Sequence, residues 1–599
     1  MRKFVPVNKK YAMKDFFKFM LASMLGFFLM ILIISFISFG ILAAIIAATT
    51  SKEITIPSNS VLQIRLDNPV VDRTPKMPLF IDLGSFGKTI GLNDILKNLK
   101  KAKKDEKIRG IFLDLSATPS GISTLDEIRE ALLDFKESGK FIIAYGEIYT
   151  QPAYYLASVA DRVYLHPEGT LMFKGINAEM FFLKGTLDKL DVKMQVIRHG
   201  KYKAAMEPFF LDKMSPENRQ QITALISQTW NRMLEGISAS RNIPVPELNA
   251  LADSLITLQP EAVLQRRLAD GLLFRDQLLD SLKKMLDLSG KKEISFVTIE
   301  NYTSVPESGS VKPGVKDKIA VIYAVGTIGS GEGDDLNIGS DRIGSAIRSA
   351  REDDRVKAIV FRINSPGGSA LASDVIWREI NLAVASKPVV ASLGDVAASG
   401  GYYIACPATR ILADPTTITG SIGVFGAIPN MKGLFNNKLG ITFDKAKTNA
   451  NSDFIPVTEP ISAYQTAVLQ NEIERVYDTF ISHVADWRKM SLSKVDSIGQ
   501  GRVWNARDAK TIGLIDDFGG LEQAILEAAN LANISEYRVI ALPRQKGPIE
   551  QIMEQLMGNA KSGLLEKELG EDYRYWQYLK EVREIKGVQA RMPFEIILN

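Results

Sequence analysis

The chain has 599 residues, of which 46% are hydrophobic and 24% are charged, and its formal net charge is +4. A chain of this length holds more than one domain with ample core, and the small net charge, without a basic-aromatic patch, does not indicate nucleic-acid binding. The single cysteine, Cys406, excludes an internal disulfide framework and any multi-cysteine metal site. Because Cys406 lies in an apolar segment, we interpret it as a buried, inert thiol.

Residues 19–51 carry no charged side chain, and this run exceeds the ~20 residues needed to cross a bilayer. The basic residues before it are opposed only by Asp15, so the positive-inside rule predicts a cytoplasmic N-terminus and an exported remainder from about residue 52. A cleaved signal peptide is the alternative, because Ala-rich sequence ends the run. The apolar stretch is longer than the usual signal region of about 7–15 residues, which favours an uncleaved anchor. The basic residues are Arg2, Lys3, Lys9, Lys10, Lys14 and Lys18.

After the anchor, apolar β-branched runs alternate with amphipathic runs, a pattern that predicts α/β units. The predicted strands are 60–68, 108–116 and 140–146, and the predicted helices are 90–105 and 124–139. The same order then recurs, with strands at 318–326, 356–365 and 387–394 and helices at 343–353 and 373–386.

A constant offset of 248 residues relates the two halves without a gap from Asp105 to at least Gly185. It pairs Asp105 with Asp353 and Tyr154 with Tyr402, and chance does not keep such a register over about eighty residues. The sequence therefore predicts an internal duplication. Each copy also carries a further helical region, at 215–240 and 459–490.

These observations predict six parts of the chain. The tail is expected to begin with amphipathic helix, to continue through charged helical sequence to Lys586 and to end in a strand within VQARMPFEIIL (588–598), and it is assigned no chemistry. The parts are a basic cytoplasmic N-terminus (1–18), the anchor (19–51), the first repeat (52–300), a linker (301–317), the second repeat (318–545) and the tail (546–599).

The segment GDVAASGGYYIA (394–405) suggests a nucleophile, Ser399. Small residues around it would let a substrate backbone approach closely, and a Pro-Gly-Gly turn at 366–368 can aim backbone N–H groups at a developing oxyanion. Taken alone, an Ala-Ser-Gly-Gly run is more often a tight helix start. The other copy helps to decide between these interpretations.

The two copies differ at the residues that would carry chemistry. At the offset of 248, Gln151 replaces Ser399, and Thr118-Pro119-Ser120 replaces the Pro-Gly-Gly turn. Conversely, the first copy contains HGKYKAAMEPF (199–209), and the residue that matches its Lys203 is Asn451, or a near neighbour once gaps are allowed. Each copy therefore keeps half of a site.

A serine needs a base to act as a nucleophile at neutral pH. Neither His166, His199 nor His483 lies in a motif that places it beside Ser399. A lysine can serve when burial lowers its pKa from ~10.4. Lys203 fits because Ala-Ala-Met follows it and the apolar residues 208–210 could shield it. Lys201 and Lys447 are the competitors, and the alternative for Lys203 is a solvated surface charge.

Five motifs resemble those of the signal peptide peptidase A family in its long, duplicated form, a family of bacterial, membrane-anchored Ser/Lys peptidases. They are INSPGGS (363–369), GDVAASGGYYIA (394–405), GSIGVFG (420–426), YKAAMEPF (202–209) and QGRVWNARDAKTIGLID (500–516). The resemblance covers nearly the whole chain. It implies an α/β fold of two tandem Clp-protease/crotonase-like ββα domains preceded by one N-terminal transmembrane helix.

The resemblance implies Ser399 as the nucleophile, Lys203 as the general base, and an oxyanion hole made by Gly400 with Gly367 or Gly368. It implies no cofactor and no metal, and a homotetramer on the periplasmic side of the bacterial inner membrane. The expected substrates are remnant signal peptides and other apolar peptides, laid as extended strands in a shallow groove. A crotonase-type acyl-transfer enzyme and a catalytically silent envelope scaffold or chaperone remain as alternatives.

Two weaker signals have simpler interpretations. The loop GTIGSGEGDD (326–335) has spaced glycines after a strand but lacks the Lys-Ser/Thr of a phosphate-binding loop, so we expect an acidic surface loop. The lysine cluster within 100–107 is expected to be a solvated helix face, with a membrane-surface contact as the alternative.

Overall fold

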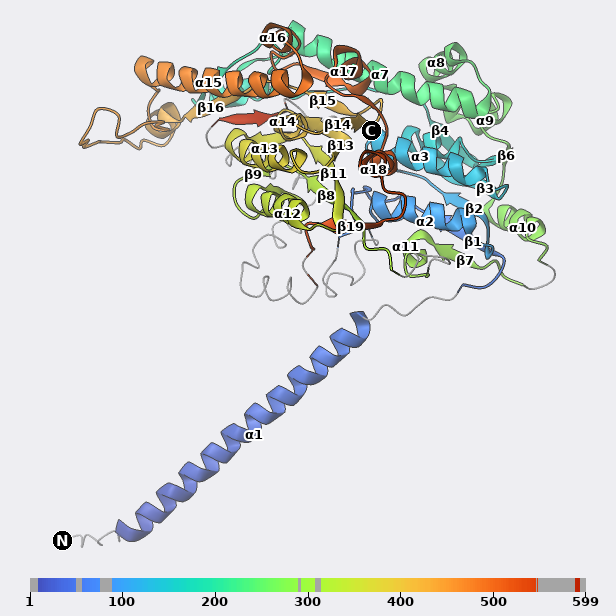
Figure 1. The fold of residues 1–599 in the computed structure, drawn as a ribbon, viewed down its shortest axis with the longest axis horizontal. Helices are drawn as coiled ribbons and strands as arrows, with labels where there is room; N and C mark the ends of the chain where they lie inside the picture. Colours follow the sequence, from blue (N-terminus) through green and yellow to red (C-terminus); the bar gives the residue numbers. More distant parts are fainter. Residues whose placement is uncertain are drawn as a thin grey trace. The chain divides into compact units, whose positions relative to one another are not determined.

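The computed structural model describes residues 9–49, 56–75, 89–288, 292–306, 314–545, 547 and 588–592. One of its two compact units contains helix α1 (Lys9–Thr49) (Figure 1). Within α1, Phe16–Ile37 forms a 22-residue apolar span whose side chains are unburied, the one helix among the described residues that is long and apolar enough to cross a bilayer. This finding fits a membrane anchor.

The first repeat forms a six-stranded, fully parallel sheet in the order β6-β4-β3-β2-β1-β7. Its central strands are nearly continuous apolar runs, as expected of strands covered on both faces. The strands are β1 (Ser60–Ile64), β2 (Ile108–Asp114), β3 (Phe141–Thr150), β4 (Arg162–Met172), β6 (Gly271–Leu272) and β7 (Phe296–Thr298). The helices between them are α2 (Leu92–Lys104), α3 (Ile122–Lys136) and α4 (Gln151–Ala157).

The second repeat forms a larger sheet in the order β17-β15-β13-β11-β8-β19, in which β14 also pairs with β13 and β18 pairs with β14. The strands are β8 (Lys318–Val325), β11 (Val356–Ser365), β13 (Val389–Ala398), β14 (Arg410–Ala413), β15 (Ile418–Gly420), β17 (Val503–Asn505), β18 (Asp517–Phe518) and β19 (Arg538–Leu542). The helices that correspond to those of the first repeat are α12 (Ser340–Glu352), α13 (Ala370–Val384) and α14 (Gly400–Ala405).

The two repeats have the same local structure. Adding 248 to the bounds of α2, α3 and β3 gives the bounds of α12, α13 and β13. The predicted duplication is therefore confirmed at the level of individual elements.

A third sheet joins the two repeats, in the order β10-β9-β12-β20-β16-β5. Strand β5 (Lys193–Arg198) belongs to the first repeat and pairs antiparallel with β16 (Phe425–Asn430) of the second over six residue pairs. The chain that follows β5 is thereby held against the second repeat. The other strands are β9 (Ile328–Gly329), β10 (Ile338–Gly339), β12 (Gly367–Ser369) and β20 (Gln589–Arg591).

The two predicted helical regions form the long helices α7 (Pro216–Arg241) and α15 (Ala463–Arg488), which extend along one side of the body (Figure 1). The predicted linker begins inside a short helix, α11 (Ile299–Tyr302). The helical part predicted for the tail lies outside the described residues, and β20 lies within its predicted strand. The remaining helices are α5 (Lys184–Lys189), α6 (Glu207–Phe210), α8 (Val245–Ser254), η1 (Ile256–Leu258), α9 (Pro260–Gln265), α10 (Arg275–Met285), η2 (Leu434–Lys438), α16 (Leu492–Ile498), α17 (Ala506–Ile512) and α18 (Leu521–Leu531).

A buried ion cluster at strand β11 of the second sheet links the two repeats. Arg362 on β11 is fully buried, and its guanidinium lies 2.6 Å from Asp72 and 2.7 Å from Glu127, both of the first repeat. The second carboxylate oxygen of Glu127 accepts the backbone N–H of Leu521 at 2.6 Å. Burial raises the pKa of Glu127, and the Arg362 charge opposes that rise.

Replacing Arg362 with methionine should destabilise the body by about 3–5 kcal/mol, because two buried carboxylates then lose their cation. The measurement is the midpoint of denaturant unfolding of the detergent-solubilised chain. Arg355→Met is the matched control, since the Arg355 side chain is 61% exposed. Equal midpoints for the two variants would contradict a role of the cluster in joining the repeats.

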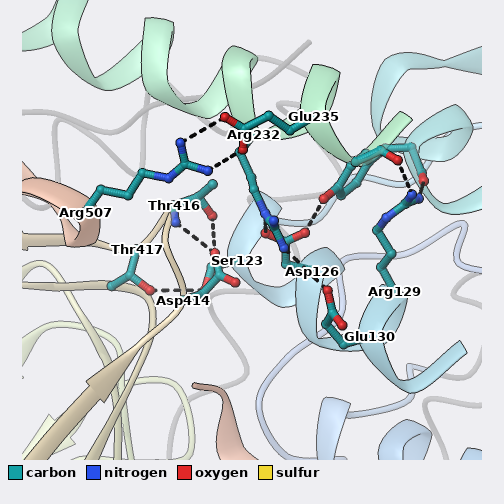
Figure 2. Close-up of polar contacts among 12 residues, drawn as sticks. Ser123, Asp126, Arg129, Glu130, Arg232, Glu235, Asp414, Thr416, Thr417 and Arg507 are labelled. Atoms are coloured by element: carbon teal, nitrogen blue, oxygen red, sulfur yellow. Dashed lines mark hydrogen bonds and ion pairs between the residues drawn. The ribbon is translucent and has the colours of Figure 1, made fainter. Parts of the chain in front are cut away.

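A second polar junction involves α3, α7, α17 and the segment after β14 (Figure 2). Arg232 of α7 donates to Asp126 of α3 at 2.8 Å, and Arg507 of α17 forms an ion pair with Glu235 of α7. Burial raises the pKa of Asp414 well above its usual range, and the negative charge of Asp126 adds to that rise. The ion pair between Arg507 and Glu235 thus joins the second repeat to the first at this junction.

The exposure of side chains tests the predictions for the acidic loop (326–335) and for the lysine cluster within 100–107. The acidic loop is exposed at Asp334 and Asp335, as expected. The lysine cluster is not uniformly solvated: Lys101 is buried, and its Nζ donates to the carbonyl of Tyr302 at 2.6 Å. The prediction was wrong there because α11 packs on this face of α2, a long-range contact that helical periodicity does not reveal. Cys406 is buried, and burial raises the pKa of its thiol.

Candidate active site

Ser399 occupies a tight turn between β13 and α14. Its φ of 57° and ψ of −115° are unusual for a residue other than glycine, so the surrounding structure must hold this strain. The N–H of Ser399 donates to the carbonyl of Gly420 at 2.7 Å, and its own carbonyl accepts the N–H of Tyr403 at 2.8 Å. The residue is fully buried.

Lys203 reaches Ser399 from the first repeat. It follows β5, whose pairing with β16 brings this part of the first repeat to the second. The Nζ of Lys203 lies 2.7 Å from Ser399 Oγ and also donates to Ser421, at 3.0 Å to its Oγ and 3.1 Å to its carbonyl oxygen. Two residues that are 196 positions apart in the sequence are thus in hydrogen-bond contact.

The surroundings of Lys203 disfavour its charged form. The side chain is 1% exposed, and desolvation lowers its pKa well below the usual value. Glycines pack against it: a Cβ on Gly501 would lie 2.6 Å from the Lys203 Cβ, and one on Gly423 would lie 3.4 Å from its Cδ. A lysine whose charged form is disfavoured by burial is a candidate to accept a proton.

The competing bases lie elsewhere. Lys201 is exposed, and Lys447 forms an ion pair with Asp453 at 2.6 Å. Among the histidines, His199 bonds to Glu474, His483 to Asp374, and the ring of His166 packs on Phe274. Of the candidates raised by the sequence, Lys203 is the one whose side chain contacts Ser399.

The Pro-Gly-Gly turn lies beside the start of α14. Gly367 has a φ of 96°, and a Cβ added to it would lie 2.7 Å from the nitrogen of Gly400. The N–H of Gly367 donates to the Oγ of Ser365 at 3.1 Å. The turn therefore brings backbone groups of residues 366–368 close to the N–H that follows Ser399.

The corresponding region of the first repeat has a different arrangement. Gln151, which matches Ser399, accepts the N–H groups of Lys174 and Gly175 at 2.6 and 2.7 Å. Its side-chain amide donates back to the carbonyl of Gly175 at 3.1 Å. At the position that matches Ser399, the first repeat therefore has a glutamine amide engaged in hydrogen bonds with backbone groups of that repeat.

Ser421 was not singled out from the sequence, although it lies in the quoted motif GSIGVFG. The signal for its role is structural: it is fully buried, has a φ of 52°, and offers two oxygens to the Lys203 amine. Side-chain geometry of this kind depends on packing between the repeats and could not be read from the motif.

With Lys203 as the general base expected from the sequence, Ser421→Ala should lower kcat/KM for the expected peptide hydrolysis by about tenfold, since one hydrogen bond that orients the Lys203 amine is lost. The lost acceptor stabilised the ammonium, so the pKa of Lys203 falls further and the acidic limb of the pH–rate profile moves to lower pH. The profile of kcat/KM, measured for both proteins, checks this. A tenfold loss without a shifted limb would contradict the proposed contact with the base.

Comparison with known proteins also finds two copies of one domain in this chain. The model of peptidase family S49 matches residues 134–289 and again residues 381–535. Protease 4 of Salmonella typhi is 38% identical and covers 79% of this chain and 77% of its own length. Protease 4 of Haemophilus influenzae is 35% identical, with coverages of 85% and 83%. The chloroplastic serine protease SPPA of Arabidopsis thaliana is 32% identical, with coverages of 85% and 75%.

A solved structure of a ClpP1 mutant from Listeria monocytogenes matches at 14% identity, with a TM-score of 0.24, over 34% of this chain and 94% of its own. That score is too low to support a conclusion. The family match and the curated relatives are sufficient to assign the chain to a family, because the family model matches both copies and the relatives cover most of the chain. The chain belongs to peptidase family S49.

Proposed function

We propose that this serine peptidase cleaves apolar peptides, including remnant signal peptides, with Ser399 as nucleophile and Lys203 as general base. The observation that carries the proposal is the 2.7 Å contact between the Lys203 Nζ and the Ser399 Oγ. It is supported by the burial of both side chains and by the lowered pKa of Lys203. A buried amine without its proton is the form that can activate a hydroxyl.

The mechanism is acyl transfer through a covalent intermediate. Neutral Lys203 takes the proton of Ser399 while the serine oxygen attacks the peptide carbonyl carbon. The ammonium of Lys203 then gives its proton to the leaving amine, and the acyl group remains on Ser399. Lys203 then takes a proton from a water molecule, whose oxygen attacks the ester carbonyl. As the ester bond breaks, the Lys203 ammonium gives this proton to the Ser399 oxygen. Ser421 orients the amine throughout, since both of its oxygens accept from Nζ.

The N–H groups of Gly400 and Gly368 are the proposed oxyanion donors. Gly400 follows the nucleophile directly, and the glycine turn approaches it closely. Between the two candidates in the turn, Gly368 is preferred, because the N–H of Gly367 already donates to Ser365. Each such donor contributes roughly 100- to 1000-fold to the rate of acyl transfer.

The membrane anchor determines where this chemistry takes place. The apolar span of α1 and the basic residues before it support an N-terminus in the cytoplasm and a catalytic body on the periplasmic side of the inner membrane. Peptides left in the bilayer after secretion are then within reach of the enzyme. The proposed assembly is a homotetramer with its active sites facing inward, and sedimentation of the detergent-solubilised chain measures the subunit number.

The decisive experiment is covalent labelling of the detergent-solubilised chain with a fluorophosphonate, together with hydrolysis of a fluorogenic apolar peptide. Mass spectrometry should place the label on Ser399, and Ser399→Ala, which lacks the nucleophile, should remain unlabelled. A chain that neither takes the label nor cleaves the peptide would support the silent scaffold. Turnover of a CoA thioester without peptide cleavage would support the acyl-transfer alternative.

A further inference from the structure

A strand from the far end of the chain lies in the third sheet beside the catalytic turn. Strand β20 (Gln589–Arg591) pairs antiparallel with β12 on one side and with β16 on the other (red in Figure 1). It therefore fills the space between the glycine turn and the strand that follows Ser421. An extended peptide substrate would add to the sheet in this way.

The register of β20 places one residue opposite the proposed oxyanion donor. The N–H of Met592 donates to the carbonyl of Pro366 at 2.6 Å, and the N–H of Ala370 donates to the carbonyl of Val588 at 3.4 Å. Hydrogen-bonded pairs recur at every second residue of an antiparallel ladder. The pair between these two bonds is Gly368 with Ala590. In that pair the Gly368 N–H faces the Ala590 carbonyl.

The carbonyl oxygen of Ala590 also lies at the start of α14. A Cβ added to Gly400 would lie 3.0 Å from this oxygen, and a Cβ added to Gly367 would lie 2.1 Å from it. Gly400 is one of the two proposed oxyanion donors, and Gly367 directly precedes the other, Gly368. The carbonyl of Ala590 thus lies where we expect the carbonyl of the substrate residue that immediately precedes the cleaved bond.

The side chains of the strand are enclosed as well. Ala590 is fully buried and Met592 is 5% exposed. Met592 packs with Leu225 of α7, Ala398 of β13 and Val503 of β17. An apolar pocket made by both repeats therefore receives the second residue after Ala590.

We propose that residues 588–592 are a built-in, substrate-like occupant of the peptide-binding groove, with Ala590 in the position before the cleaved bond and Met592 in a pocket lined by Leu225 and Val503. The proposal rests on the function proposed above. Substrates must displace this strand, so the tail competes with them for the groove. The register also assigns the specificity: a small residue before the cleaved bond and an apolar residue two positions after it.

The test compares the full chain with a chain truncated after Gly587, both in detergent. Truncation should lower KM for a fluorogenic apolar peptide and leave kcat unchanged, because a competing segment affects substrate binding only. A tethered segment acts at an effective concentration of about 1 mM. If the free pentapeptide acetyl-Val-Gln-Ala-Arg-Met-amide inhibits the truncated enzyme with a constant of about 0.1 mM, KM should differ by about tenfold.

Proline substitution gives the matched controls. The pentapeptide with proline in place of its alanine lacks the N–H that pairs with the Gly368 carbonyl, so it should inhibit at least tenfold less well. In the full chain, Ala590→Pro should reproduce the low KM of the truncated enzyme without changing chain length. Equal KM values for the full, truncated and proline-substituted chains, with no inhibition by the pentapeptide, would overturn the proposal.

A binding measurement separates this proposal from the proposed function. A fluorescein-labelled pentapeptide should bind the truncated Ser399→Ala chain, measured as a rise in fluorescence anisotropy, whether or not the enzyme cleaves peptides. Binding together with an inert wild type would reject the peptidase mechanism and retain the groove. Robust hydrolysis together with absent binding would reject the groove occupant alone.

Discussion

Replacing Lys203 with methionine should abolish peptide hydrolysis and at the same time stabilise the fold. The activity should fall by about four orders of magnitude or more, because Lys203 is both the proposed base that activates Ser399 and the proposed acid that protonates the leaving amine. Stability rises because methionine fills a similar volume and has no charge to desolvate. The rate of peptide hydrolysis and the thermal unfolding midpoint of the detergent-solubilised chain measure the two effects.

The gain in stability should depend on pH in a defined direction. In the unfolded chain Lys203 binds its proton with a pKa of ~10.4, whereas burial lowers the pKa in the folded chain. Between these two values the unfolded state binds more protons, so the wild type becomes less stable as pH falls. The advantage of the methionine variant therefore grows from pH 10 downward and becomes constant below the folded pKa.

Lys201→Met is the matched control for this result. Lys201 is exposed and lies two residues away, so its loss should change neither activity nor the unfolding midpoint appreciably. Full activity of Lys203→Met would place the base elsewhere. An unfolding midpoint that falls instead of rising would contradict the claim that the Lys203 amine is held at an energetic cost.

Gly367→Ala should lower kcat/KM by roughly 100- to 1000-fold, comparable to the loss of one oxyanion donor. The φ of 96° at this position strains any other residue. The new Cβ would also lie 2.7 Å from the nitrogen of Gly400, so it would displace the carbonyl of a bound substrate from the proposed hole. Steady-state kinetics with the fluorogenic peptide check the expected loss.

Gly139→Ala separates backbone strain from the blocking of the site. Gly139 also has a positive φ, of 75°, but a Cβ there meets no atom within 4 Å. This variant should lose some stability and keep wild-type kcat/KM. Similar kinetic losses in both variants would mean that strain, rather than the crowded approach to Gly400, explains the effect at Gly367.

Local sequence patterns predicted helices at 343–353 and 373–386 and a strand at 387–394, where the structure has α12, α13 and β13. Comparison of the two copies added the differences at Gln151 and Asn451, which pointed to Ser399 and Lys203 as halves of one site. The contact between these two residues was not predictable from periodicity. It depends on the pairing of β5 with β16, which joins strands of different repeats.

Other features escaped prediction for the same reason. The burial of Lys101 follows from α11 packing on α2, and the cluster around Arg362 depends on carboxylates more than two hundred residues away in the sequence. The tail was expected to end in a strand, but only the sheet order reveals that this strand lies between β12 and β16. Local patterns specify elements, whereas partners far along the chain depend on tertiary packing.

The division of the site between repeats has a consequence for the order in which the protein is made. Lys203 precedes Ser399 by 196 residues, so at about 5–20 residues per second the ribosome needs about 10–40 s to complete the second half of the pair. Throughout that interval the emerging chain holds the proposed base without the proposed nucleophile. With the pair divided in this way, hydrolysis can begin only after both repeats have been synthesised, folded and docked.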